Sequence, residues 1–155
     1  MQTISPCLWF DRQAEEAINY YASIFKGSRV VDVMRFGDAG PGPSGTVLAA
    51  SLEMDGQTLI AMNGGPMFKF TPAISLFIHC RTQAEIDHYW SKLLAGGQAQ
   101  QCGWLTDKFG VTWQVVPTML GQMLRDPDAE RAARVMKVML TMVKLDIAAL
   151  TQAYG

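Results

Sequence analysis

The residue in this sequence best placed to take part in binding chemistry is a glutamine in the middle of a predicted strand. The turn-forming residues Asp107–Gly110 precede a β-branched and aromatic run, Val111–Val116, which ends at Pro117. Gln114 lies inside that run, and a buried mid-strand amide must find hydrogen-bond partners. Two roles fit this position equally well: Gln114 orients a ligand, or it satisfies neighbouring backbone groups.

The spacing of the two histidines does not form a metal-ligand pair. His79 is predicted at the end of a strand and His88 on a helix, with no Cys or carboxylate at ligand spacing beside either. Residues two apart on a strand share a face, so His79 can face a pocket together with Ser75 and Phe77. A hydrogen-bonded histidine at a strand end is favoured over metal ligation.

Cys102 is the cysteine to consider as a nucleophile. A reactive thiol needs a nearby cation or a helix N-terminus that favours its thiolate form. Neither occurs beside Cys102 in the sequence, and Lys108 lies across a turn. We therefore expect a buried structural cysteine.

The glycines in the loop 40–45 match the GxGxxG pattern of dinucleotide-binding loops. That pattern works where a strand leads into the glycines and a helix N-terminus follows them. Here prolines remove backbone N–H donors, and the predicted strand Thr46–Met54 follows. A plain loop is favoured, and no other glycine loop opens a helix as a nucleotide or S-adenosylmethionine site would.

The composition is that of a globular protein without a surface for polyanions. The 155 residues are 49% hydrophobic and 17% charged, with a formal net charge of −1, which suits one compact domain. This charge balance predicts neither nucleic acid nor an anionic membrane as a partner. The three cysteines form no even disulfide set, and neither a signal peptide nor a membrane span is recognisable. We expect a cytoplasmic protein.

Turn residues and hydrophobic periodicity predict the same order of elements twice. The first half is expected to form a strand, a helix that begins after Asp11 as N-cap, and three strands, with a hairpin turn at Asp55–Gly56. The order starts again about 70 residues later, which indicates a duplicated unit. The predicted strands lie at 4–10, 30–36, 46–54, 57–63, 73–80, 98–105 and 111–116, and the second helix at 83–94.

The last part of the chain is predicted to be helical. Residues 128–142 have helical periodicity without Gly or Pro, and 143–154 continue it after a bend near Lys144–Leu145. We expect this tail to pack on the sheet or on a partner subunit, in preference to acting as a ligand lid. Its methionine-rich apolar stripe contains Met136, Met139, Leu140 and Met142.

Several stretches of the chain resemble the PhnB-like proteins. These form a branch of the vicinal oxygen chelate superfamily, which includes glyoxalase I, bleomycin-resistance proteins and extradiol dioxygenases, and they are often labelled 3-demethylubiquinone 3-methyltransferase-like. The resemblance covers essentially the whole chain and is most specific from Cys102 to Pro117. The other matching stretches lie at 8–21, 55–59, 62–66, 87–90, 134–140 and 144–150.

This resemblance implies an α+β fold, in which paired βαβββ modules form a curved mixed sheet around a cup, followed by C-terminal helices. It implies one domain over residues 1–155, with module one at about 1–65, module two at about 72–117 and a helical tail at about 118–155. Such proteins are commonly homodimers. The element order derived from turns and periodicity agrees with this architecture.

The resemblance also places the metal ligands of the superfamily, a His near the start and a Glu in the last strand of each module. The matching positions are near Ile4 or Pro6 and near Ile60 in module one, and near Ser75 and at Gln114 in module two. Only Gln114 could ligate, and a neutral amide is a weak ligand compared with carboxylate or imidazole. We therefore expect no metal and no other cofactor, and no S-adenosylmethionine motif supports the methyltransferase label.

The sequence thus favours a PhnB-like protein that binds a small, partly apolar molecule in a metal-free cup, and it does not decide whether a reaction follows. The alternatives are a metal-dependent enzyme of the glyoxalase or dioxygenase type with His79 as one ligand, the methyltransferase of the family label, and an interaction protein whose tail is the working surface. The candidate ligand-binding residues are Gln114, Thr112, Ser75, Phe77, His79, Trp9, Met62, Asn63, Phe68, Phe70 and Trp104.

Overall fold

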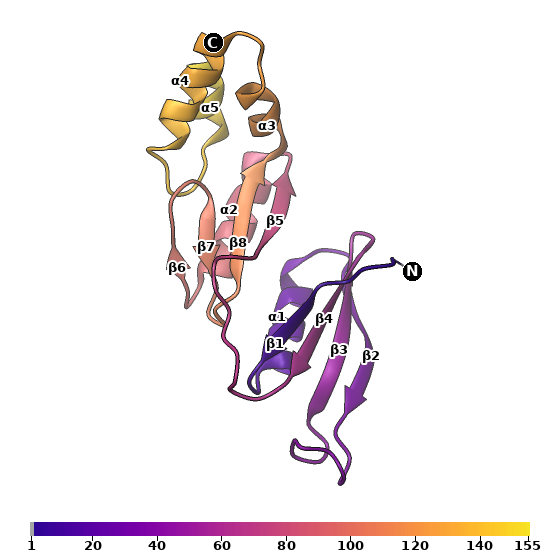
Figure 1. The fold of residues 1–155 in the computed structure, drawn as a ribbon. Coiled ribbons are helices and arrows are strands. Elements are labelled where there is room, and N and C mark those ends of the chain that lie inside the picture. The colour runs from indigo at the N-terminus through magenta and orange to yellow at the C-terminus, as the bar shows by residue number, and fades with distance from the viewer. Residues whose placement is uncertain (1) are drawn as a thin grey trace. The chain divides into compact units, whose positions relative to one another are not determined.

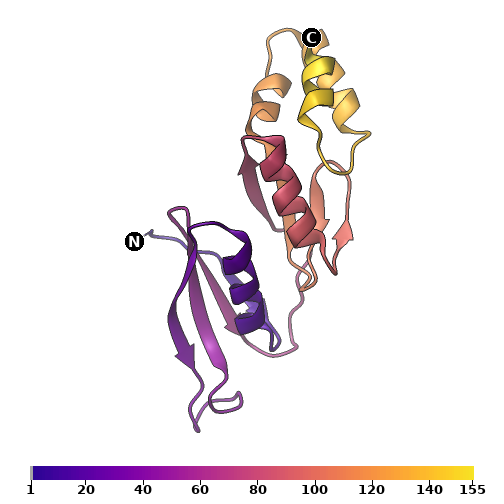
Figure 2. The same cartoon turned by 180° about the vertical axis from the view of Figure 1, so that it is seen from behind.

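The structure is a computed structural model that describes residues 2–155, and it divides into two compact units. The first unit ends at Phe70 and the second comprises Thr71–Gly155. Each unit contains a four-stranded mixed sheet with a helix on one face, as the views from opposite sides show (Figures 1 and 2). The predicted α+β class and the repeated βαβββ order are confirmed. Among the residues described, no helix is long and apolar enough to cross a membrane.

The first unit is one βαβββ module. Its strands lie in the order β1-β4-β3-β2, with β1 parallel to β4 and the other neighbours antiparallel. Buried residues of α1 at helical spacing cover one face of the sheet. The elements are β1 (Cys7–Phe10), α1 (Ala14–Ile24), β2 (Arg29–Arg35), β3 (Val47–Met54) and β4 (Gln57–Asn63).

The start of α1 differs from the prediction that Asp11 is its N-cap. The helix begins at Ala14 after Gln13, whose side chain makes no capping hydrogen bond. The acceptor comes instead from the last strand of the module, because Oδ1 of Asn63 accepts a hydrogen bond of 2.9 Å from the backbone N–H of Ala14. A strand residue far away in the sequence therefore accepts the hydrogen bond that a local N-cap side chain usually accepts.

The predicted hairpin turn at Asp55–Gly56 is confirmed. Both residues have positive φ, 46° and 80°, which is the combination required by the tight turn that joins two antiparallel strands. The turn fixes the register of β3 against β4, with Met54 opposite Gln57.

The edge strand β2 contains a β-bulge. Its pairing with β3 shifts between Val31 and Met34, and Asp32, which lies between them, has a positive φ of 52°. The extra residue bends the strand and places Met34 opposite Ala49.

The second unit is a βαβββ module followed by three helices. Its strands lie in the order β5-β8-β7-β6, with β5 parallel to β8 and the other neighbours antiparallel. Thr82 caps the N-terminus of α2 by accepting a hydrogen bond from the backbone of Glu85. The elements are β5 (Ser75–Cys80), α2 (Gln83–Leu94), β6 (Gln98–Ala99), β7 (Trp104–Thr106), β8 (Thr112–Pro117), α3 (Thr118–Leu124), α4 (Ala129–Met139) and α5 (Ile147–Tyr154).

The single strand predicted over 98–105 is two short strands. Between them Cys102 and Gly103 have positive φ, 60° and 83°, which no continuous strand allows. Their backbone N–H groups donate to the carbonyls of Met142 and Val143, at 2.9 and 2.8 Å. The chain leaves the sheet here because its backbone pairs with the tail.

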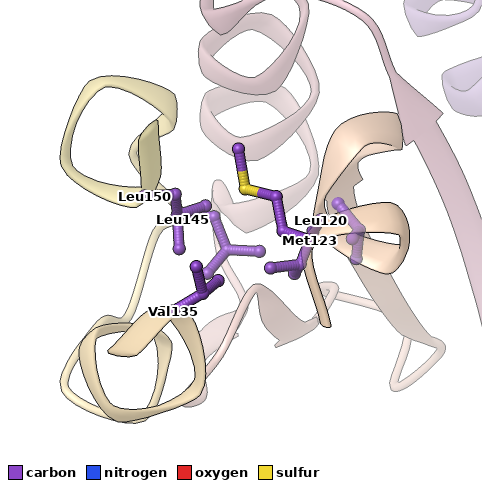
Figure 3. Close-up of a cluster of buried hydrophobic side chains, with 6 residues drawn as sticks. Leu120, Met123, Val135, Leu145 and Leu150 are labelled. Atoms are coloured by element: carbon purple, nitrogen blue, oxygen red, sulfur yellow. The ribbon is translucent and has the colours of Figure 1, made fainter. Parts of the chain in front are cut away.

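The tail forms a small core with the end of β8. Figure 3 shows side chains from α3, α4 and α5 pointing toward one another. The predicted helices were too long, since α4 ends at Met139 and α5 begins at Ile147. Met139 and Met142 pack on this core, whereas Met136 and Leu140 are 41% and 57% exposed. The predicted methionine-rich stripe therefore has one pair of residues on the core and one pair facing solvent. The buried members are Val116, Leu120, Met123, Val135, Leu145 and Leu150.

Candidate functional site

The second sheet has one face covered by α2, which lies in front of the sheet in Figure 2, and one face without a helix, which is seen in Figure 1 and which we call the open face. The covered side contains buried residues of β5 and β8 such as Ile78, Trp113 and Val115. Side chains alternate along a strand, so the residues between them lie on the open face. The open face contains Ser75, Phe77, His79, Thr112 and Gln114 from β5 and β8, and Trp104 and Thr106 from β7. Val116, next in this alternation, is buried in the core of the tail.

The register brings six predicted site residues together on this face. In the parallel pair β5 and β8, Ser75 lies opposite Thr112 and Phe77 opposite Gln114. In the antiparallel pair β7 and β8, Trp104 lies opposite Gln114. The amide of Gln114 is therefore flanked by an aromatic residue on each neighbouring strand. The sixth predicted residue, His79, packs its ring on Phe77 at 4.8 Å.

Gln114 bonds to another predicted site residue. Its Nε2 donates a hydrogen bond of 2.9 Å to Oγ of Ser75 on the neighbouring strand, and both side chains are partly exposed. Within the described chain this is the hydrogen bond that Gln114 makes through its side chain, which leaves Oε1 available as an acceptor. Gln114 thus does not serve neighbouring backbone groups, one of the two roles considered from the sequence.

Thr112 carries an unpartnered polar atom. The residue is 2% exposed, and its Oγ1 is buried without a hydrogen-bond partner among the described residues. A buried hydroxyl without a partner costs about 1–3 kcal/mol.

Thr106 and Gln100 extend the polar part of the face, and sequence reasoning missed both. Thr106 lies opposite Thr112, and its Oγ1 accepts a hydrogen bond of 2.8 Å from Nε2 of Gln100. The available signal was spacing, because Thr106 lies two residues after Trp104 and so shares its face.

Three other predicted residues form an apolar group in the first unit. Trp9 lies opposite Met62 on the face of the first sheet away from α1, and the ring of Phe68 packs edge-on against the Trp9 indole at 5.0 Å. The indole Nε1 donates to the carbonyl of Gly65 at 2.9 Å. Gly64 lies so close beneath the indole that a Cβ there would be 2.4 Å from Trp9.

The remaining two predicted residues have contacts on the helix side of the first unit. Asn63 holds the start of α1 through Oδ1 and donates from Nδ2 to the carbonyl of Val47 at 3.0 Å. Phe70 packs edge-on against the buried ring of Phe10 at 5.1 Å. The side chain of Asn63 is thus committed to the fold of its own unit.

The residues at the four metal positions do not fit a divalent metal ion. Ser75 and Gln114 offer one hydroxyl and one amide, and these bond to each other. In the first unit Ile60 offers only hydrocarbon, and its backbone N–H donates to the carbonyl of Pro6. In residues 2–155 no three His, Cys, Asp or Glu side chains gather as a metal site would require.

The glycine-rich loop between β2 and β3 does not fit a nucleotide or S-adenosylmethionine. It leads into a strand, as predicted, and the ring of Phe36 lies against it. A Cβ at Gly42 would be 2.4 Å from that ring, and one at Gly40 would be 2.9 Å from it. These glycines therefore allow close packing over Phe36.

The thiols are not placed for nucleophilic catalysis. Burial raises the pKa of Cys80 to about 12, which keeps its thiol protonated. Cys102 is partly exposed, unlike the buried residue that the sequence predicted, and its Sγ lies 3.6 Å from the carbonyl oxygen of Met139. Cys7 is exposed, with a pKa raised by desolvation.

A shallow hollow lies in the first unit, beside the β3–β4 hairpin, and none of the predicted site residues lines it. Its wall is polar and includes the exposed ion pair of Arg29 and Glu53, at 2.9 Å. Gln2 bonds across it to the carbonyl of Gly56. Because hydrogen bonds and an ion pair already satisfy these groups, the hollow is a weaker candidate than the open face.

Comparison with known proteins gives a family and a group of similar folds. The model of the 3-demethylubiquinone-9 3-methyltransferase family matches residues 2–116, and no curated protein matches the chain. The structure is similar to that of a PhnB protein from Bacillus cereus, with 38% identity, a TM-score of 0.70, and coverage of 75% of this chain and 99% of that one. It is also similar to protein PA1353 from Pseudomonas aeruginosa, with 25% identity, a TM-score of 0.65, and coverage of 76% and 98%.

A more distant similarity concerns the fold alone. The fosfomycin resistance protein FosX from Mesorhizobium loti is 13% identical, with a TM-score of 0.51 and coverage of 72% of this chain and 87% of that one.

Proposed function

Because this chain belongs to the 3-demethylubiquinone-9 3-methyltransferase family of PhnB-like proteins, within the vicinal oxygen chelate superfamily, we propose that it binds a small, partly apolar molecule on the open face without a resident metal ion. The observation that carries the proposal is the hydrogen bond between Ser75 and Gln114, with Gln114 flanked by Phe77 and Trp104 on the neighbouring strands. Small-molecule sites combine an apolar wall with a few polar groups in this way.

The first unit has a separate apolar group of its own. Trp9, Met62 and Phe68 present partly exposed apolar surface on a sheet face without a helix. The proposed site lies on the open face of the second unit and does not include this group. Asn63 and Phe70 are left out of the proposed site because of their contacts beside α1.

The proposal can be tested by NMR titration of the full chain with a panel of small aromatic molecules. We expect backbone and side-chain amide shifts on β5, β7 and β8, and weaker binding by Gln114→Ala than by wild type. The matched control is Gln57→Ala on the first sheet, where an exposed glutamine is removed. Shifts confined to the β3–β4 hairpin, or equal binding by both variants, would contradict the proposal.

The absence of a resident metal has its own test. Elemental analysis of protein purified without chelators should give far less than one equivalent of Zn, Mn, Ni or Fe. One equivalent of any of these would favour the metal-dependent enzyme with His79 as a ligand. The methyltransferase of the family label predicts binding of S-adenosylmethionine in a calorimeter, and we expect none, because the glycine loop packs on Phe36.

The proposal includes a homodimer in the cytoplasm. The dimer is supported by the family to which the chain belongs, and the location by three free thiols, which suit a reducing compartment. Light scattering of the purified protein tests the first point. Mass analysis of the thiols in protein recovered from cells tests the second.

A further inference from the structure

The strands of the sheet that carries the open face contain no acidic side chain and no Lys or Arg. Its strands read Ser-Leu-Phe-Ile-His-Cys, Gln-Ala, Trp-Leu-Thr and Thr-Trp-Gln-Val-Val-Pro, without Asp, Glu, Lys or Arg. His79, the titratable residue of the open face, lies two positions along β5 from Phe77. A ligand carboxylate or phosphate that docks beside Gln114 would lose water without gaining an opposite charge. The sheet therefore favours an uncharged ligand.

The hydrogen-bonding groups of the face are complementary to one kind of polar edge. Oγ of Ser75 accepts from Gln114, so its own proton remains available to donate. Oε1 of Gln114 remains available to accept. A donor on β5 and an acceptor on β8 thus lie side by side. A ligand edge with a carbonyl next to an N–H satisfies both at once.

The aromatic residues on either side set the shape of the ligand. Trp104, Gln114 and Phe77 occupy one row across three neighbouring strands. Strands lie about 4.8 Å apart, so the two aromatic residues are separated by about 10 Å at the backbone. Gln114 is the middle residue of this row, so a flat ring lies above its amide, in reach of both aromatic side chains. Phe77 is 46% exposed and free to make such a contact.

Resting on the proposed function, we infer that the ligand of the open face is an uncharged, flat aromatic molecule with a carboxamide or lactam edge. The ligand carbonyl accepts from Ser75, its N–H donates to Oε1 of Gln114, and its ring lies between Trp104 and Phe77. This assigns the chemical class of the ligand, which the family membership leaves open.

Three probes of nearly the same shape test the inference. Benzamide has both the carbonyl and the N–H, N,N-dimethylbenzamide lacks the N–H, and benzoate carries a negative charge. Each is titrated into the full wild-type chain, and the side-chain amide of Gln114 and the indole N–H of Trp104 are followed by NMR. We expect benzamide to bind at least tenfold more tightly than either other probe, which corresponds to about 1.4 kcal/mol.

Introducing a negative charge at Gln114 gives a second test. Gln114→Glu replaces the amide by a carboxylate of the same shape, and it should bind the cation benzamidinium at least tenfold more tightly than wild type does. The matched control, Gln57→Glu on the first sheet, should leave benzamidinium binding unchanged. A thermal melt establishes that each variant is folded. If Gln114→Glu does not fold, the ranking of the three probes on wild type decides the class of the ligand.

The outcomes separate the ligand class from the proposed function. Benzoate or N,N-dimethylbenzamide binding on the open face as tightly as benzamide would overturn the carboxamide class and leave small-molecule binding intact. No shift on β5, β7 or β8 with any probe would contradict the proposed function as well. Benzamide as the tightest ligand, with its shifts on the open face, would support both.

Discussion

The indole Nε1 of Trp113 donates a hydrogen bond of 2.9 Å to Oδ2 of Asp107, and both residues are almost fully buried. The other oxygen of the same carboxylate, Oδ1, accepts from the backbone N–H groups of Phe109 and Val111, at 2.9 and 3.0 Å. One side chain thus closes the turn before β8 and anchors the strand that carries Gln114.

Replacing Asp107 should be strongly destabilising. Asp107→Ala leaves the Trp113 indole and two backbone N–H groups without this acceptor, and hydrogen bonds to charged groups are worth about 1.5–3 kcal/mol each. We expect the free energy of unfolding in urea to fall by about 3 kcal/mol or more. Asp38→Ala, in an exposed loop, should change it by less than about 0.5 kcal/mol. Similar losses for both variants would contradict this role of Asp107.

The bond between Ser75 and Gln114 should appear as an energetic coupling. Gln114→Ala should lower the free energy of unfolding by about 1 kcal/mol, because the hydrogen bond is neutral and partly exposed. The double variant with Ser75→Ala should lose about 1 kcal/mol less than the sum of the single losses. Strict additivity in urea unfolding would show that the bond contributes nothing to stability.

Two leucines of the tail should differ sharply in their effect. Leu145 is fully buried in the core of the tail, whereas Leu140, at the end of α4, is 57% exposed. Leu145→Ala should therefore lower the unfolding free energy by about 2–5 kcal/mol. Leu140→Ala, the same chemical change, should cost less than about 1 kcal/mol. Denaturant melts of both variants give the comparison.

Gly103 should not tolerate a side chain. A Cβ at this position would lie 2.8 Å from the carbonyl oxygen of Val115 and 3.0 Å from Leu145, and the φ of 83° is itself unfavourable for other residues. Gly45 has a similar φ of 87°, and a Cβ there would meet nothing within 4 Å, so Gly45→Ala measures the backbone strain alone. Gly103→Ala should cost about 2 kcal/mol more than Gly45→Ala in thermal or urea unfolding. Equal losses of stability for the two variants would mean that the atoms around Gly103 move to accommodate the added Cβ.

The contact of Tyr154 with Asp126 should make the stability of the tail depend on pH. The Tyr154 hydroxyl donates to Oδ2 of Asp126, which lowers the pKa of Asp126 and raises that of Tyr154. The stabilisation from Asp126 is present above its ordinary pKa near 3.8 and is lost as pH falls below it. That from Tyr154 is present below its ordinary pKa near 10.0 and is lost as pH rises above it. Between these two pH values the stability of Tyr154→Phe should be lower than that of wild type by a constant amount. Outside them the two stabilities should converge.

The measurement for this pair is the melting temperature of both proteins across the pH range. The variant keeps the ring, over which the guanidinium of Arg131 lies at 3.8 Å from the centroid. A difference that does not change with pH would therefore contradict a role for the hydrogen bond to Asp126.

Features fixed by local chemistry could be predicted from the sequence. The bounds of β4 agree with the predicted strand because Asp55–Gly56 sets where the hairpin turns. The face shared by Ser75, Phe77, Thr112 and Gln114 follows from alternation along two strands that begin in register. The turn at Asp107 was recognised from its residues, but its bond to the Trp113 indole was not.

Features that depend on distant partners could not be predicted. The N-terminus of α1 is set by Asn63, which lies 49 residues further along the chain. The interruption between β6 and β7 depends on backbone bonds from Cys102 and Gly103 to the tail. Both examples involve polar groups whose partner is decided by packing, and hydrophobic periodicity carries no information about such pairs.

The bulge at Asp32 bears on how the protein behaves when concentrated. A strand at the edge of a sheet exposes free backbone groups that can join the sheet of another molecule and start a fibril. On β2 this hazard is increased by Val33 and Met34, which are 48% and 57% exposed. The left-handed turn of the backbone at Asp32 breaks the flat, regular edge that such stacking needs. The bulge thus makes this edge a poor template for strands of neighbouring molecules.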